Sequence, residues 1–265
     1  MRRRLAAALA LSACACALVI PGIAPAADVG AQAWVVPAPR LLKETYFSNL
    51  RDGDSIETPF LLKFGLTGMG IAPIVKPLPM TGHHHLLVDR DLPLDFTKPL
   101  PFNEQYIHFG KGQMETVLTF APGDHTLRLV LADDKHIPNF VYSKPLHIKV
   151  TKKNDVDPKS LVVKSVAILG PRSGEHVSAP FRVAFHASGL NVSNLALKEA
   201  GTGHFRLRIK PDAGKEEVIA MDNGYTEVWL KPPAGGYSAK VEFIDNVSGT
   251  QVLAASEPVA FKVDH

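Results

Sequence analysis

The chain contains two copies of one sequence pattern, and this internal repeat limits its possible folds more than any other feature. Residues 51–60 align with residues 172–181 at a spacing of 121 positions. Residues 122–133 align with residues 234–245 at a spacing of 112 positions. Because one duplication accounts for both matches, we predict two tandem domains of about 100 residues, each long enough to bury its own core.

Apolar and polar residues alternate within each copy, as is typical of β-strands. The alternating apolar positions are Phe60, Leu62, Phe64, Leu127, Leu129 and Leu131 in the first copy and Phe181, Val183, Phe185, Ala239, Val241 and Phe243 in the second. The chain has 21 prolines and 20 glycines, which separate short strands. No stretch after residue 26 has a helical period. The sequence therefore predicts an all-β protein with two tandem immunoglobulin/fibronectin-like β-sandwich domains.

A short motif in the second copy supports this fold class. Gly235-Gly236-Tyr237 precedes an alternating strand and resembles the penultimate strand of immunoglobulin-like and fibronectin-like domains. In those domains a tyrosine at this corner ties the strand to a neighbouring loop. His125 occupies the equivalent position of the first copy, so we expect it to form the corresponding structural hydrogen bond.

The N-terminus has the composition of a secretory signal peptide. Three arginines at 2–4 precede an apolar run over 5–20, and Ala24-Pro25-Ala26 supplies small residues for cleavage before Ala27. The run of about 16 residues is shorter than the roughly 20 that a transmembrane helix needs. We therefore expect a periplasmic or secreted protein with no transmembrane segment in the mature chain. Residues 11–14 also fit a lipobox, so a lipoprotein attached through Cys14 is the alternative.

These patterns divide the chain into five parts. We expect a signal peptide at 1–26, an extended lead-in at 27–43, a histidine-rich β-sandwich domain at 44–150, a linker at 151–161 and a degenerate second copy at 162–265. Removal of the signal peptide leaves 26 basic and 26 acidic residues, so the charge gives no reason to expect nucleic acid as a partner. Both cysteines, Cys14 and Cys16, lie in the signal peptide, which excludes disulfides and thiol chemistry from the mature chain.

Histidines distinguish the first copy from the second. Seven of the eleven histidines fall in the first copy, and the repeat alignment keeps only His83, as His204. The other six, His84, His85, His108, His125, His136 and His147, become Phe205, Arg206, Ala220, Tyr237, Ser248 and Ala260. Since the second copy is expected to share the fold without these histidines, they are candidates for a function of the first copy.

Strand parity sorts the histidines by face. His84 has the phase of Leu86 and Val88 and should face the core, where we expect its ring to bond to the backbone. His83 and His85 then face the opposite side, close enough for two imidazoles to chelate one ion. His108 should point outward from its strand, and the loop that carries His136 also offers Asp134 as a candidate ligand.

Metal binding is the chemistry that this set of side chains predicts. We expect His83, His85, His108 and His136 to hold copper or zinc, which both accept imidazole ligands. A thioether from Met69, Met80 or Met114 would favour copper, although methionine is also a common packing residue.

The first copy also resembles a family of exported bacterial domains of unknown function. The resemblance rests on Gly68-Met69-Gly70-Ile71-Ala72-Pro73, Thr81-Gly82-His83-His84-His85-Leu86-Leu87-Val88-Asp89, His108-Phe109-Gly110-Lys111-Gly112-Gln113 with Glu115, and Pro122-Gly123-Asp124-His125-Thr126-Leu127. The second copy matches only through its framework residues. The resemblance implies an extracytoplasmic setting and brings no established reaction.

Two further classes of function compete with metal handling. A non-enzymatic module could bind another envelope protein or a glycan through its loops and sheet edges, with the histidines in structural roles. An enzyme is not expected, because the sequence lacks a G-x-S-x-G elbow, an H-E-x-x-H motif and a cysteine nucleophile in the mature chain. Glu115 is retained as Glu227 in the copy without these histidines, so we expect it to be structural.

Overall fold

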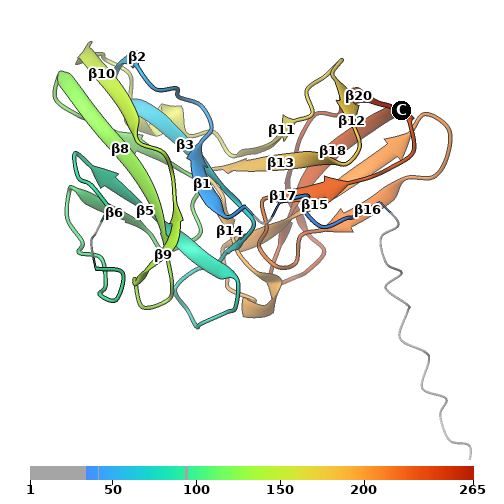
Figure 1. Ribbon diagram of the computed structural model, residues 1–265, viewed down its shortest axis with the longest axis horizontal. Coiled ribbons are helices and arrows are strands. Elements are labelled where there is room, and N and C mark those ends of the chain that lie inside the picture. The colour runs from blue at the N-terminus through green and yellow to red at the C-terminus, as the bar shows by residue number, and fades with distance from the viewer. Residues whose placement is uncertain (1–33, 41, 93–94) are drawn as a thin grey trace, which may run out of the picture. The chain divides into compact units, whose positions relative to one another are not determined.

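The computed structural model in Figure 1 describes residues 34–40, 42–92 and 95–265. The expected signal peptide at 1–26, with Cys14, and the first part of the lead-in lie outside the described residues. Within the described ranges, no helix has the length and hydropathy needed to cross a bilayer.

The first copy is a sandwich of a small and a large sheet. β1, β3 and β7 form the small sheet in the order β1-β3-β7, and the large sheet has the order β2-β10-β8-β5-β4, with β6 paired to β5 and β9 paired to β8. The strands are β1 Glu44–Phe47, β2 Asp54–Thr58, β3 Phe60–Thr67, β4 Gly70–Ile71, β5 Thr81–Val88, β6 Tyr106–Phe109, β7 Glu115–Leu118, β8 Gly123–Ala132, β9 Pro138–Tyr142 and β10 Leu146–Lys153.

The second copy repeats this topology strand for strand. Its small sheet is β11-β13-β17 and its large sheet is β12-β20-β18-β15-β14, with β16 on β15 and β19 on β18. The strands are β11 Ser165–Gly170, β12 His176–Ser178, β13 Phe181–Ser188, β14 Asn191–Val192, β15 Thr202–Pro211, β16 Glu217–Ala220, β17 Glu227–Leu230, β18 Gly235–Asp245, β19 Val252–Ala255 and β20 Val259–Asp264. The predicted all-β fold of two tandem fibronectin-like sandwiches is confirmed.

The alternation seen in the sequence builds the two cores. Leu62 and Phe64 of β3 pack against Leu86 of β5 and Leu129 of β8 between the two sheets of the first copy. The equivalent strands of the second copy bury Phe185, Phe205 and Phe243. Removing apolar side chains from water in this way is the main favourable contribution to the stability of each sandwich.

The tyrosine corner is present in the second copy and has a histidine counterpart in the first. The Tyr237 hydroxyl donates to the Pro233 carbonyl at 2.7 Å. His125 Nε2 donates to the Ala121 carbonyl at 3.0 Å, and Nδ1 lies 2.9 Å from Asp89 Oδ2. The structural role expected for His125 is therefore confirmed.

The segments before and between the copies take part in regular structure. Val36 donates its N–H to the Trp229 carbonyl, and Lys231 donates to the Trp34 carbonyl, so the middle of the lead-in pairs with the edge of β17. β10 continues to Lys153, past the expected boundary at residue 150, and a 3-10 turn, η1, spans Pro158–Leu161 in the expected linker. A second short turn, η2, spans Leu195–Leu197.

Two glutamates hold the copies together in equivalent ways. Glu115 of β7 accepts hydrogen bonds from the Ser188 hydroxyl and the Gly189 N–H of the second copy, and His186 Nε2 lies 3.1 Å from its other oxygen. Glu227 of β17 accepts a hydrogen bond from the Thr67 hydroxyl of the first copy at 2.8 Å. The structural role expected for Glu115 is confirmed, because a buried carboxylate needs such partners.

Candidate metal centre

Three histidines share the outer face of the large sheet in the first copy. β5 lies between β6 and β8, and His85 is directly opposite His108 of β6. Directly opposed residues of antiparallel strands point to the same face, and residues two apart on a strand do so as well. His83, His85 and His108 therefore project together, while His84 projects into the core.

Their ring nitrogens converge. His83 Nε2 lies 2.9 Å from His85 Nε2, and the His108 ring lies 4.8 Å from the His83 ring and 5.0 Å from the His85 ring. One potential ligand atom from each of the three side chains lies within 4.8 Å of the other two. A tetrahedral zinc site with metal–nitrogen distances near 2.0–2.1 Å has nitrogens about 3.3 Å apart, so the three rings would have to rotate to reach that geometry.

His136 is the outer member of the group. It lies between β8 and β9 with a φ of 63°, a left-handed conformation held by Asp133, whose Oδ1 accepts from the N–H groups of Lys135 and Ile137. The His136 ring is 4.9 Å from the His108 ring and 5.1 Å from the His83 ring. All four predicted residues therefore come together, but His136 lies outside the compact set of three. Asp134, also expected as a loop ligand, is not in that set and lines a cavity of about 30 Å³ beside His83.

The structure buries this face, which the sequence did not predict. His83 and His85 are 1% and 0% exposed, although strand parity placed them on the outer side of the sheet. The connection between β5 and β6 covers them, and the N–H of Leu100 donates to the His136 carbonyl at 2.9 Å. Phe102 lies over the group, with its ring 4.7 Å from His136, 5.0 Å from His108 and 6.1 Å from His85.

Two positions that shape the histidine cluster were not predicted from the sequence. Phe102 lies in a loop without periodicity, and only its apolar character beside Pro101 marks it. Gly110 follows His108 by two residues on the same side, and a Cβ at Gly110 would collide with the His108 ring. The glycine therefore makes room for the imidazole, and its position in the His108-Phe109-Gly110 motif was the available signal.

Burial keeps the imidazoles unprotonated. Burial, with a smaller contribution from the neighbouring histidines, lowers the pKa of His83 to about 2 and that of His85 to about 3. Burial also lowers the pKa of His108, with a contribution from His136. Neutral rings at physiological pH have free lone pairs, which metal coordination requires.

Several buried nitrogens of the group have no hydrogen-bond partner among the described residues. They are His85 Nδ1, His108 Nε2 and His136 Nε2. An unsatisfied buried polar atom costs about 1–3 kcal/mol, so a bound ion or an ordered water would stabilise the arrangement.

The second copy replaces the group with fixed polar pairs. His204, the counterpart of His83, has Nδ1 2.7 Å from Asn246 Oδ1. Arg206, the counterpart of His85, forms an ion pair with Glu242 at 2.7 Å. Ala220 stands opposite Arg206, where His108 stands in the first copy. The fold therefore forms without the cluster.

His84 and the methionines lie apart from the cluster. His84 is fully buried with its ring 4.9 Å from Phe64, and burial lowers its pKa to about 4. The Gly65 backbone beside the ring offsets part of the lowering by burial, although neither ring nitrogen forms a hydrogen bond of normal geometry to a described residue. Met69 and Met114 lie in the core cluster with Phe185.

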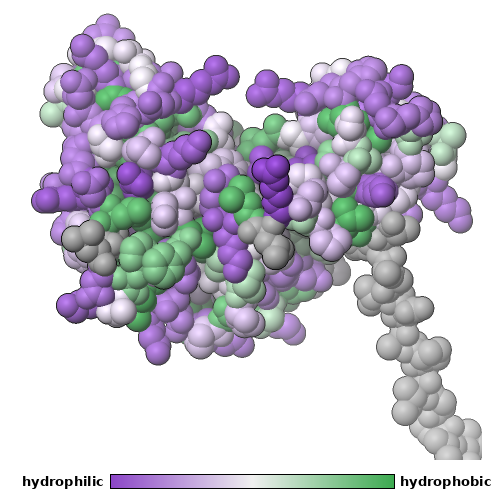
Figure 2. Space-filling view, in the orientation of Figure 1, coloured by the Kyte–Doolittle hydropathy of each residue, from purple (hydrophilic) through white to green (hydrophobic). Residues whose placement is uncertain are grey.

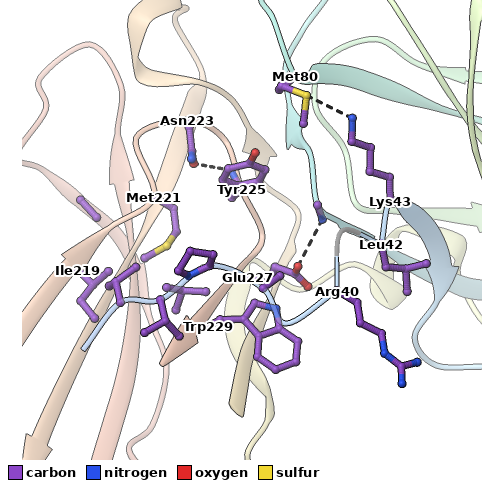
Figure 3. Close-up of a pocket in the computed structure, with 17 residues that line it drawn as sticks. Arg40, Leu42, Lys43, Met80, Ile219, Met221, Asn223, Tyr225, Glu227 and Trp229 are labelled. Atoms are coloured by element: carbon purple, nitrogen blue, oxygen red, sulfur yellow. Dashed lines mark hydrogen bonds between the residues drawn. The ribbon is translucent and has the colours of Figure 1, made fainter. Parts of the chain in front are cut away.

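Met80 lies at a separate cavity, shown in Figure 3. Its sulfur accepts from Lys43 Nζ at 3.4 Å. The cavity has a volume of about 390 Å³ and is lined by apolar side chains such as Ile219, Met221 and Trp229, and none of its described lining residues is a histidine. The methionines therefore give no support for copper over zinc.

One protein-family model matches the part of the chain that carries the cluster. Residues 62–151 match the model of a domain of unknown function, DUF4399, and this range contains all four histidines and the motifs quoted above. No curated protein matches the sequence.

Solved structures similar to this chain include fibronectin modules. Fibronectin(III)-like modules of CbhA from Clostridium thermocellum are 16% identical with a TM-score of 0.25, over 83% of this chain and 92% of that one. A two-domain fibronectin type III segment of chicken tenascin is 15% identical with a TM-score of 0.22, over 84% and 98%. The FN1–FN3 domains of chicken CNTN1 are 11% identical with a TM-score of 0.28, over 83% and 67%.

Proposed function

We propose that this protein is an exported metal-handling protein whose first sandwich binds one copper or zinc ion. His83, His85 and His108 are three of the ligands, and His136 supplies a fourth. The observation that carries the proposal is the convergence of three neutral imidazoles from two neighbouring strands on one buried face. The second copy keeps the topology without them, so the cluster is not a requirement of the fold.

The chemistry of the cluster suits these metals. Zinc and copper both bind imidazole nitrogen, and the lowered pKa values of His83 and His85 mean that no proton has to be displaced from the cationic form at neutral pH. A groove of about 580 Å³, lined by Ile74, Val75 and Lys111 among others, reaches His108 and offers a path to the ligands. Export through the signal peptide at 1–26 would place this site in the periplasm or outside the cell.

Elemental analysis with calorimetric titration of zinc and copper tests the proposal. The mature protein should bind about one ion per chain, and a His83→Ala/His85→Ala variant should lose that ion. The control is His147→Ala/His176→Ala, because these histidines are exposed on the two copies and pair with Asp52 and Asp264. Circular dichroism would show whether each variant is folded. His108→Ala is a milder second variant, since His108 is only partly buried.

The cluster variants and the control together decide whether the site exists. Metal loss in the cluster variants with retention in the control would support the site. Equal binding by the wild type and the cluster variants, or loss in the control, would contradict it.

An exposed aromatic surface favours a second candidate, a non-enzymatic envelope or glycan-binding module. The rings of Phe96 and Phe140 stack at 4.4 Å with an interplanar angle of 16°, and Phe140 is 78% exposed. Figure 2 shows apolar surface gathered over the part of the first sandwich that carries β5, β6 and β9. Exposed apolar patches commonly mark binding surfaces.

Co-sedimentation with purified peptidoglycan separates this candidate from metal handling. A glycan-binding module should sediment in its wild-type form and stay in solution as Phe96→Ser/Phe140→Ser, with unchanged metal content. If the wild-type protein did not sediment, the proposed glycan binding would be contradicted.

A further inference from the structure

The ligand group carries no negative charge. Among the described histidines, cysteines and carboxylates, the compact set of possible ligands around His83 consists of imidazoles alone. Asp133 is close in sequence to His136, but its Oδ1 already accepts from two backbone N–H groups. Asp133, Asp134 and Lys76 line the small cavity on another side of His83, so positive and negative charges are mixed there.

The surroundings of the group are apolar on the sides formed by β8 and by Phe102. Val130 and Ala132 of β8 stand directly opposite His85 and His83 and are fully buried. They belong to a small apolar cluster with Leu87 and Leu100 on this face of the sheet. Phe102 closes the group from the other side. An ion held here would therefore lie in a medium of low polarity.

Ion charge decides which metal such a site prefers. The cost of transferring an ion from water to a medium of low polarity grows with the square of its charge, so this cost is about four times as large for a doubly charged ion as for a singly charged one. Sites for doubly charged ions commonly recover that cost with an anionic ligand or a bound hydroxide. Cupric copper also prefers a tetragonal set of ligands, whereas this group offers three clustered nitrogens beneath a phenyl ring.

Given the metal site proposed above, on which this inference rests, we propose that the ion this site selects is cuprous copper. The neutral imidazoles of His83, His85 and His108, under the apolar cap of Phe102, select the singly charged ion over cupric copper and zinc. Phe102 acts as a specificity-determining residue by excluding water and anions from the side of the ion that it covers. Ligand softness has no part in this selection, because no thiolate or thioether is present in the group.

Competition titrations on the mature full-length protein test the selectivity. Cuprous copper would be titrated without oxygen against a chromophoric cuprous chelator, and cupric copper and zinc against amino-acid or chromophoric competitors. The wild type should bind cuprous copper at least ~100-fold more tightly than cupric copper. Equal or tighter binding of cupric copper or zinc would overturn the inference.

A pair of substitutions at Phe102 tests the cause. Phe102→Asp places a carboxylate beside His108 and His136 and should reduce the ratio of cuprous to cupric affinity at least ~10-fold, whereas Phe102→Leu keeps an apolar cap and should change it less. Phe102 is 58% exposed, so neither change disturbs a core. An unchanged ratio in Phe102→Asp would refute the role of the cap.

These outcomes differ from a failure of the metal site itself. If no metal ion bound to the wild type, the proposed function would fall and this inference with it. If zinc or cupric copper bound stoichiometrically through His83 and His85 without a cuprous preference, only the inference of selectivity would fall.

Discussion

His83 Nε2 and His85 Nε2 lie 2.9 Å apart on the same face of β5. At this distance the Nε2 that carries a hydrogen donates a hydrogen bond to the other Nε2, so the pair is satisfied only when the two rings adopt complementary tautomers. A metal ion removes this restriction by accepting a lone pair from both rings. The contact therefore holds two ligands close to their binding geometry before any ion arrives, which lowers the ordering cost of binding.

Loss of His108 should separate metal binding from folding. Loss of a partner outside the ligand set often costs 10–100-fold in metal affinity, so His108→Ala, which removes a ligand, should cost at least ~100-fold. In wild-type protein a metal concentration of 100 times Kd should add about 2.7 kcal/mol to the free energy of unfolding. Urea unfolding with and without metal should show this gain in the wild type and little of it in His108→Ala. An equal gain in both would remove His108 from the ligand set.

Gly110→Ala should weaken metal binding without a large loss of stability. The added Cβ would collide with the His108 ring, so the ring would have to shift from its position in the cluster. The matched control is Gly170→Ala, because a Cβ at Gly170 would meet no atom within 4 Å. Metal titration and urea unfolding of both variants check the expectation. Wild-type affinity in Gly110→Ala would show that the His108 ring does not need this space.

His84→Phe should make the protein more resistant to acid. The folded pKa of His84 is about 4, below the unfolded value near 6.5, so the unfolded chain takes up a proton first as the pH falls. The free energy of unfolding then decreases by up to about 1.4 kcal/mol per pH unit between these values, whereas above pH 6.5 the group has no effect. Phenylalanine, as at Phe205, removes this loss.

Urea midpoints at pH 7 and pH 5 measure the effect of His84→Phe. The difference between the variant and the wild type should be larger at pH 5, with metal binding retained because His84 faces the core. A difference independent of pH would contradict the assignment of this pKa.

Glu115→Gln should destabilise the contact between the copies. Burial raises the pKa of Glu115, but hydrogen bonds from His186, Ser188 and Gly189 lower it by more, so the net pKa lies below its usual value. Its stabilising effect is therefore present above the unfolded pKa near 4.5 and is lost as the pH falls through the folded value. We expect a loss of about 1–3 kcal/mol at pH 7 from the buried hydrogen bonds.

An exposed glutamate provides the control for Glu115→Gln. Glu57 is 44% exposed in its side chain and pairs with Lys152, so Glu57→Gln should change the free energy of unfolding by less than about 1 kcal/mol. Denaturant unfolding at pH 7 and pH 4 compares the two variants. Equal effects would show that Glu115 is not held by the second copy in solution.

The local sequence pattern predicted much of the fold and part of the candidate metal centre. The spacing of the repeat and the alternation of residues such as Phe60, Leu62 and Phe64 predicted paired sandwiches, because side chains on a strand alternate between two faces. The same parity placed His84 in the core and His83 and His85 together on the other face. The strand register and the loop that covers the histidines could not be predicted, because both depend on segments distant in the chain.

The amino-acid sequence by itself determined the duplicated all-β fold, the core residues and the shared face of His83 and His85, since each depends on residues close along one strand. Only the tertiary structure decided that His108 stands opposite His85, that His136 turns toward them, and that Phe102 covers the group. It also decided that Trp34 and Val36 pair with β17. These contacts depend on how strands pair and loops fold back, which hydrogen bonding and packing across the whole domain select.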